Sequence, residues 1–248
     1  MFRIYFLIAS FLMLPAAQAQ DVNFANAAAQ VRTHTLINKL TAENVLVGAD
    51  FALDTIGHAI KTTSNARVIH EQMAGMAHRL NGVRAILVLS KDGILQHDSY
   101  RFPVREIDLS DRPYFKASQK TSSLILGDIS LGRTSGVPFL PLAKRVGEHT
   151  LVAIVSPHFL ISQQTQCEDC VSAIIRPNGK VIASFPPATE IPLDILSLPV
   201  INRASEGIDR ADFLHSDTAI AWKQSEAYPI IVMSARGLTG SARVGIYD

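Results

Sequence analysis

A stretch of about 60 residues without proline limits the fold of this chain more than any other feature of its sequence. Residues 20–81 contain no proline, and their apolar side chains recur at steps mostly near three to five residues. Such spacing is typical of an amphipathic helix. A helix of that length is unusual in a globular protein, so we expect a break at residues 62–65, where Ser64 or Asn65 can cap a second helix. The apolar positions of the first part are Val31, Leu36, Leu40, Val47, Phe51 and Ile56.

At residue 83 the apolar pattern changes to one that is typical of β-strands. Residues 83–89 and 94–100 are β-rich runs on either side of a Lys91-Asp92-Gly93 turn, which predicts a hairpin. Residues 111–119 predict a short helix, with Pro113 in its first turn, where proline is tolerated. Helix, hairpin, helix and strands in this order indicate one α+β domain with an antiparallel sheet. The further strands expected in it are residues 124–129, 137–145 and 150–156.

A second and shorter copy of this pattern follows. Residues 171–175 and 180–184 are apolar runs around an Arg176-Pro177-Asn178-Gly179 turn. The segment DRADF at residues 209–213 likewise echoes DRPYF at residues 111–115. The repetition predicts two similar domains after one long helix. Its closing strands are expected at residues 219–222 and 229–235.

The first residues of the chain predict export. Arg3 precedes an apolar run from Ile4 to Leu14, and Ala17-Gln18-Ala19 offers a small-residue cleavage site. Eleven apolar residues are short for a membrane span, which needs about 20. The prediction is a cleaved signal peptide and a periplasmic or secreted protein, and an uncleaved N-terminal membrane anchor is the alternative.

These elements predict a division of the chain into five parts. They are a signal peptide at residues 1–19, a helical region at 20–81, a first domain at 82–166, a second, smaller domain at 167–238 and a tail at 239–248.

Composition and motifs exclude several classes of function. A hydrophobic fraction of 48% is too high for a disordered chain, and a net charge of +1 offers no general field for nucleic acid. The eight histidines are scattered, and no H-E-x-x-H, G-x-S-x-G, G-x-G-x-x-G or phosphate-binding loop occurs. We therefore expect no metal, no cofactor and no enzymatic activity, although a triad assembled in space stays open at this point.

The arrangement resembles the double Cache, or tandem PAS-like, sensor module found in bacterial diguanylate cyclases, histidine kinases and chemoreceptors. The similarity covers about residues 30–238. It implies a long N-terminal helix beside two stacked PAS-like domains with antiparallel sheets, of which the membrane-distal one usually holds a small ligand. The segments that carry the resemblance are Asp111–Phe115, Leu126–Ile129, Gly132–Gly136, Val137–Val146, Leu151–Phe159 and Asn178–Ser184.

The resemblance also implies a way of signalling. Family members of known layout continue into a second transmembrane helix and a cytoplasmic output domain, whereas this sequence ends at Asp248. We expect a sensor module that binds a small molecule and signals through a membrane-bound partner. The alternatives are a degenerate receptor remnant, or a ligand-free interaction protein that dimerises or docks on a receptor through its long helix. A periplasmic hydrolase is a more distant third.

Candidate ligand-binding residues follow from the amino-acid-binding branch of that family, in which an Arg-x-aromatic-aromatic motif holds the ligand. Arg112, Tyr114 and Phe115 match it. A guanidinium suits a carboxylate because its donors form a bidentate fork. The branch also has a tyrosine where this chain has Ile107 and an aspartate near Ser156, so a simple carboxylate or another small anion fits better than an α-amino acid. The alternative is that Arg112 pairs with Asp108 or Asp111 and the aromatic residues belong to the core.

Two further residues are weaker candidates for the same pocket. Arg133, in the loop Gly132–Gly136, is expected to be either a second cation facing the ligand or a solvated loop charge. Tyr100, at the end of the hairpin, lines the pocket or packs in the core.

Cys167 and Cys170 form a C-x-x-C motif at the expected domain junction. Such a pair can be a redox pair, half of a metal site or a disulfide. Val171 follows where covalent haem attachment needs histidine, and the chain has no second C-x-x-C for structural zinc. For an exported protein the prediction is a disulfide between the two.

Overall fold

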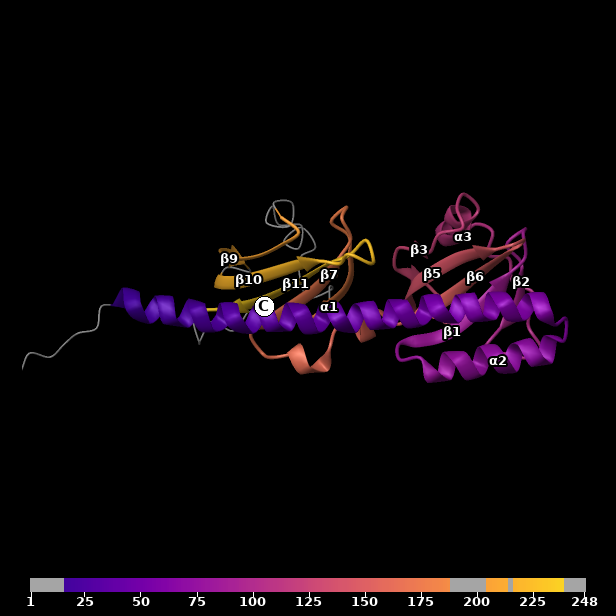
Figure 1. Ribbon diagram of the computed structural model, residues 1–248, viewed down its shortest axis with the longest axis horizontal. Coiled ribbons are helices and arrows are strands. Elements are labelled where there is room, and N and C mark those ends of the chain that lie inside the picture. Colours follow the sequence, from indigo (N-terminus) through magenta and orange to yellow (C-terminus); the bar gives the residue numbers. More distant parts are fainter. Residues whose placement is uncertain (1–15, 188–203, 214–215, 239–248) are drawn as a thin grey trace, which may run out of the picture.

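The computed structural model describes residues 16–187, 204–213 and 216–238. Helix α1 (Ala16–Thr62) runs along most of the molecule, and two antiparallel sheets lie side by side against it (Figure 1). The expected α+β class, with a long N-terminal helix followed by two sheet domains, is confirmed. The predicted tail and the first 15 residues of the predicted signal peptide lie outside the described residues.

Helix α2 (Ala66–Arg79) begins after the predicted break. Asn65, one of its two expected caps, accepts hydrogen bonds at Oδ1 from the backbone N–H groups of Arg67 at 3.1 Å and Val68 at 3.3 Å. These bonds satisfy two N–H groups that have no partner inside the helix. The chain thereby turns back, and α2 packs beside α1 and β1 (Figure 1).

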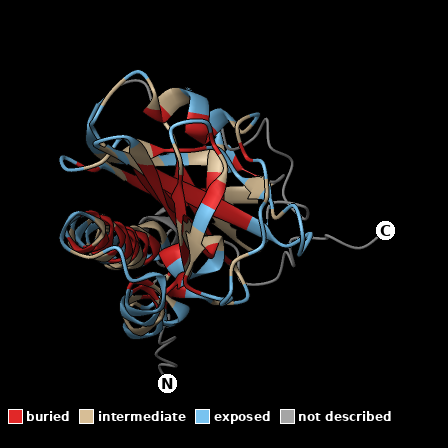
Figure 2. Cartoon of the chain, turned by 90° about the vertical axis from the view of Figure 1, so that its right-hand side faces the viewer, coloured by how far each residue is buried: buried red, intermediate tan, exposed pale blue. Residues whose placement is uncertain are grey.

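The buried face of α1 differs from the expected one. Leu36, Leu40, Val47 and Phe51 are 40%, 59%, 54% and 63% exposed. Val31 and Ile56 are buried as expected, but most of the buried face consists of other residues, many of them alanines, and it lies toward the sheets, as the end view shows (Figure 2). Alanines alternate on this face with large side chains such as Leu46, Leu53 and Ile56, while the other four expected residues face solvent. The buried set is Val31, Ala42, Val45, Leu46, Ala49, Ala52, Leu53 and Ile56.

The first sheet has the order β2-β1-β6-β5-β3, and β4 also pairs with β5. Helices α1 and α2 cover one face, and α3 (Pro113–Ser118) packs on the other (Figure 1). Its strands are β1 (Val83–Leu89), β2 (Leu95–Asp98), β3 (Ile125–Leu126), β4 (Ser130–Leu131), β5 (Pro138–Val146) and β6 (His149–Val155).

The strand expected at residues 124–129 is shorter than predicted, since only Ile125–Leu126 form β3, and a separate short strand, β4, follows at Ser130–Leu131. Gly127 lies so close to Pro141 that a Cβ atom on it would overlap the proline ring, and its N–H donates to the Pro141 carbonyl at 2.8 Å. The segment therefore leaves the edge of the sheet after β3 and returns as β4. This detour brings residues 128–136 toward the second domain and the α3 side of the sheet.

The second sheet has the order β8-β7-β11-β10-β9. The echo of the α3 motif in this half is not a helix, because residues 209–213 belong to strand β9 and pair along their whole length with β10. Its strands are β7 (Cys170–Ile175), β8 (Val181–Phe185), β9 (Glu206–Phe213), β10 (Ser216–Gln224) and β11 (Ile231–Gly237). The short 3-10 helices η1 (Pro157–Leu160) and η2 (Gln163–Thr165) connect the two sheets.

A buried asparagine on α1 joins that helix to the second sheet. Asn38 Oδ1 accepts from the Ser162 N–H at 3.0 Å and from the Thr165 hydroxyl at 2.8 Å. Its Nδ2 donates to Ser172 Oγ at 3.0 Å and lies 3.5 Å from Ser234 Oγ. Because the amide is fully buried, these bonds hold α1 at one position against the domain.

Among residues 16–187, 204–213 and 216–238, no helix combines the length and hydropathy that crossing a bilayer requires.

Candidate ligand-binding site

A cavity of about 290 Å³ lies on the face of the first sheet that α1 and α2 leave uncovered. Strands β1, β2, β5 and β6 form one side, and residues 107–114 and 132–135 form the other. Alternate residues of each strand face it, while their neighbours pack toward α1. Its apolar wall consists of Ala85, Leu87, Leu95, Ile107, Leu109, Tyr114, Phe139 and Ile154.

The aromatic wall is well packed. Tyr114 is 3% exposed and meets Phe139 edge to face, with ring centroids 6.3 Å apart. Burial raises the pKa of the Tyr114 phenol, so the group stays neutral at physiological pH. Phe115, one residue further along α3, does not line the cavity and packs in the core behind it.

Arg112 enters the cavity from the residue before α3. Pro113 occupies the first helical position, so the backbone of Arg112 is extended, with φ −67° and ψ 132°. Nη2 donates to the Leu131 carbonyl at 3.2 Å. Nε is buried and has no hydrogen-bond partner among the described residues. The cation is therefore desolvated on one side and retains a donor for a ligand.

The alternative pairing of Arg112 with Asp108 or Asp111 is not what the structure contains. Arg133 contacts these residues instead: its guanidinium donates to the Asp108 carbonyl and to Asp111 Oδ2, both at 2.6 Å. Arg133 also lines the cavity, next to Thr134 and Ser135. It holds the loop against the segment that precedes α3, so it shapes the cavity as well as adding charge to it.

Asp98 is a polar residue of the cavity that sequence reasoning missed. It ends β2, and its Oδ1 accepts the Tyr100 N–H at 2.8 Å. Burial raises the pKa of this carboxyl, against the lowering effects of the Tyr100 N–H and of the nearby His70 and Arg101. Tyr100 itself is 83% exposed and lies at the rim. The only sequence signal for Asp98 was its position two residues before a candidate aromatic.

Ser156, at the position where the family resemblance implies an aspartate, does not line the cavity. It is buried after β6, and its N–H donates to the Gly82 carbonyl at 2.8 Å. The acidic group of this site thus comes from the hairpin strand and not from the late strand.

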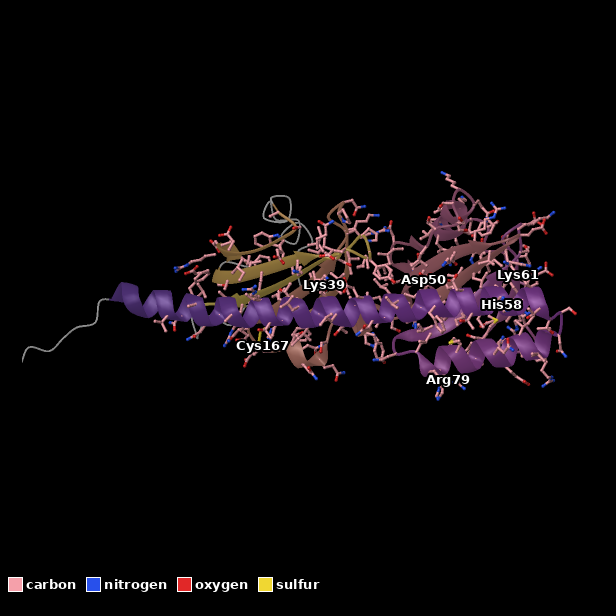
Figure 3. The ribbon with its side chains drawn as sticks, in the orientation of Figure 1. Lys39, Asp50, His58, Lys61, Arg79 and Cys167 are labelled. Carbon is pink, nitrogen blue, oxygen red and sulfur yellow. A yellow bond between two sulfur atoms is a disulfide. The ribbon has the colours of Figure 1, made fainter. Side chains whose placement is uncertain are left out.

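Cys167 and Cys170 form a disulfide between η2 and β7. Cys170 is buried, and its Sγ lies 3.9 Å from Nδ1 of His34 on α1. Cys167 lies alongside α1 in the half of the molecule that contains the second sheet (Figure 3).

The lining of the cavity combines charged, polar and apolar side chains. Three arginines, one carboxylate and the hydroxyls of Thr134 and Ser135 border its apolar walls, and no histidine or cysteine lines it. The arginines are Arg84, Arg112 and Arg133. In the part of the chain that the structure describes, no three His, Cys, Asp or Glu side chains come together as metal ligands would. A small, partly apolar molecule with an anionic end matches these walls.

No family model and no curated protein matches this sequence. Several solved structures, however, match the fold of the chain. The extracellular domain of a protein described as the histidine kinase rpHK1S-Z16 superposes with a TM-score of 0.66 and 21% identity, covering 90% of this chain and 96% of the other. A domain of a sensory box/GGDEF family protein from Vibrio parahaemolyticus gives 0.66 and 17% identity, over 90% and 99%.

A third match is the ligand-binding domain of chemoreceptor Tlp3 from Campylobacter jejuni, in complex with L-valine. Its TM-score is 0.62 at 10% identity, covering 94% of this chain and 99% of that one. These matches show that the chain shares the fold of these domains. The chain has the double Cache fold, with two PAS-like domains in tandem along one N-terminal helix.

Proposed function

We propose that this protein is an extracytoplasmic sensor domain that binds a small anionic molecule, most simply a carboxylate, in the cavity of its first domain. The single observation that carries the proposal is Arg112, which lines an apolar cavity and whose buried Nε has no hydrogen-bond partner among the described residues. An unpaired donor on a partly desolvated cation is costly unless a ligand uses it. No catalysis is proposed for the site.

The ligand can also carry a positive end. Asp98 lines the cavity and brings a carboxylate that an ammonium group would pair with, beside the backbone N–H groups of Tyr100 and Arg101. Amino acids therefore belong in the ligand search beside simple carboxylates, and the Tlp3 domain of the same fold was crystallised with L-valine. A cationic group near Asp98 would favour the ionised carboxylate and offset the effect of burial on its pKa.

Signalling is proposed to pass through α1 to a membrane-bound partner or a second copy of the chain. Leu36, Leu40, Val47 and Phe51 form an exposed apolar stripe on this helix. Lone exposed apolar residues are common, but four on one helix face are suited to pairing with another helix. Cleavage after Ala19 would release residues 20–248 to the periplasm or the exterior.

A thermal-shift screen of residues 20–248 tests the ligand proposal. The compounds are small carboxylates, amino acids, amines and purines. A ligand at 100 times its dissociation constant should stabilise the fold by about 2.7 kcal/mol. We expect hits among the carboxylates or amino acids, with weaker shifts in Arg112→Ala. Hits that shift both proteins equally would remove Arg112 from the site.

The second candidate function is a ligand-free interaction protein, and the exposed stripe on α1 favours it. Analytical ultracentrifugation separates the two functions. A dimer that dissociates in Leu40→Glu, together with no hit in the screen, would support interaction without a ligand. Leu46→Glu is not a useful variant here, because that residue is fully buried against the sheets.

A further inference from the structure

Residues 126–136, which we call the strap, touch both the cavity and the second domain. The strap contains β4 and the loop that follows it. Its pairing with the first sheet is short, since β4 matches β5 at only two positions, Ser130 with Phe139 and Leu131 with Pro138. Side-chain contacts at its two ends therefore contribute a large part of what holds it in place.

At the cavity end, two arginines hold the strap. Nη2 of Arg112 donates to the Leu131 carbonyl at 3.2 Å. Arg133, which belongs to the strap, reaches the Asp108 carbonyl and the Asp111 carboxylate at 2.6 Å each. The same two guanidinium groups line the cavity, so an anion bound there competes with strap oxygen atoms and with Asp111 for the same donors.

At the other end, two cationic side chains of the second domain bind the strap. Asp128 receives a hydrogen bond from Arg176 at 2.6 Å on Oδ1 and one from Lys180 at 2.7 Å on Oδ2. Arg176 also donates to the Leu126 carbonyl. Both cations lie on the β7–β8 hairpin, and the Arg176 side chain is only 19% exposed. We call these three side chains the clasp.

The clasp and the cavity are joined by a short piece of chain. Asp128 precedes Leu131 by three residues, so a shift of one end of the strap is transmitted through very little flexible backbone. Gly127 is fixed by its bond to Pro141 at 2.8 Å, which gives the strap a pivot next to Asp128. The contacts form a continuous chain from the β7–β8 hairpin to the guanidinium of Arg112.

We propose that Asp128, Arg176 and Lys180 are positioning residues that set the orientation of Arg112 from the second domain. The clasp holds the Leu131 carbonyl where Arg112 can reach it. An anion that draws Arg112 away from the Leu131 carbonyl, or Arg133 away from Asp108 and Asp111, weakens the clasp. Because coupling between two sites is reciprocal, release of the clasp weakens the hold on Arg112 by the same free energy. This inference rests on the proposed function of the cavity, and it names the route by which occupancy reaches the second domain.

The test uses no ligand, so its failure is distinct from failure of the ligand screen. The ¹⁵Nε–Hε NMR signal of Arg112 is assigned by its loss in Arg112→Lys and then followed in Asp128→Asn. The control is Asp217→Asn, which breaks the pair between Asp217 and Arg210, whose acid is similarly exposed, at 41% against 45% for Asp128. We expect the signal to move in Asp128→Asn and to stay in place in the control, with partial return in Asp128→Glu.

Hydrogen exchange measures the same coupling in the opposite direction. Arg133→Gln frees the cavity end of the strap, and the hairpin amides of Arg176 and Gly179, which bond to Lys180 and Arg176 carbonyls, report on the clasp. We expect their exchange to speed up roughly two- to five-fold, the size set by loss of a partly exposed ion pair. An unmoved Arg112 signal in folded Asp128→Asn, or unchanged hairpin exchange in folded Arg133→Gln, would overturn the proposal.

Discussion

Two segments of nearly the same sequence take different structures in the two domains. DRPYF starts α3 in the first domain, and DRADF lies within β9 in the second. Arg112 of the first segment lines a cavity. Arg210 of the second forms a bidentate ion pair with Asp217 on the neighbouring strand, in which Nε donates to Oδ1 at 2.8 Å and Nη2 donates to Oδ2. A motif of five residues therefore does not define a ligand site.

The third residue of each segment explains part of the difference. Pro113 has no N–H to give to a strand, and its fixed φ suits the first turn of a helix. Ala211 has its N–H and lies opposite Thr218 in an unbroken antiparallel ladder. The alternating burial of β9 follows from its place at the edge of the sheet. Pairing with a neighbouring strand thus decides whether such a segment becomes a helix or a strand, which the five-residue motif does not determine.

The pockets of the two domains also differ in whether their polar side chains have partners within the protein. The second domain has one of about 400 Å³ between α1 and the β9–β10 edge, bordered by Arg32, Glu206 and Trp222. Glu206 is paired with Lys223, and the Trp222 Nε1–H donates to the Ala204 carbonyl at 3.0 Å. Glu206 and Trp222 thus have partners within the protein, whereas the first cavity retains a buried donor without a partner on Arg112.

The largest expected effect separates the two arginines. Arg112→Ala should weaken binding of an anionic ligand by roughly 10- to 150-fold, because a charge-assisted hydrogen bond contributes about 1.5–3 kcal/mol. Arg210→Ala, the matched control, should leave that affinity unchanged. Isothermal titration of both variants with a hit from the screen measures the difference. Equal losses in the two variants would mean that the comparison between the motifs carries no functional meaning.

Gly207→Ala should destabilise the second domain by about 1–3 kcal/mol, the usual cost of overpacking. A Cβ at Gly207 would overlap the ring of Trp222, which its bond to Ala204 holds in place. Gly75→Ala on α2 is the control with the opposite sign, because nothing lies near that position and alanine favours the helix by about 0.5–1 kcal/mol. Urea unfolding measures both, and an unchanged midpoint for Gly207→Ala would show that Trp222 can move aside.

Removal of the disulfide should cost the second domain roughly 2 kcal/mol, since the closed loop is very short. The first domain contains no cysteine, so the effect should be confined to exchange of amides near residues 167–175. The variant is Cys167→Ser with Cys170→Ser, compared by urea unfolding. Thiol labelling of the denatured native protein without reductant should find no free thiol, and two labelled cysteines would contradict the bond.

The smallest effect is a pH dependence that differs between two polar contacts. Hydrogen bonding from Lys180 and the nearby charges lower the pKa of Asp128 below its usual value. The clasp therefore contributes stability above about pH 4, the unfolded pKa, and loses it as the pH falls through the lower folded pKa. Asp128 is 45% exposed, so we expect less than about 1 kcal/mol.

Lys144, which joins the first sheet to α1, behaves in the opposite way. Burial acts to lower its pKa, but bonds to Asp54 at 2.7 Å and Asp50 at 3.0 Å outweigh burial and raise it. Its contribution is complete below about pH 10.4 and is lost as the pH rises through the higher folded pKa. Urea midpoints against pH for Asp128→Asn and Lys144→Gln should lose the acid and the alkaline slope respectively. The same slope in wild type and variant would remove that contact as its source.

Local signals in the sequence predicted the helices and most of the strands, but not β4 or β9. Proline-free helical spacing predicted α1, and Asn65 marked the start of α2. Gly93 and Gly179, both with φ of 85°, marked the hairpin turns, because a positive φ suits glycine. The two cysteines three residues apart predicted their own bond. Each of these features depends on residues that are close together along the chain.

Tertiary structure alone decided which side chains meet across the chain. The sequence could not say that alanines of α1 would face the sheets while Leu40 and Phe51 faced solvent, because both sets are apolar at helical spacing. It could not bring Asp98 into the cavity with Arg112, or place Arg176 on Asp128 across 48 residues. Such pairings depend on strand order and on the close packing of whole layers, which a local pattern does not encode.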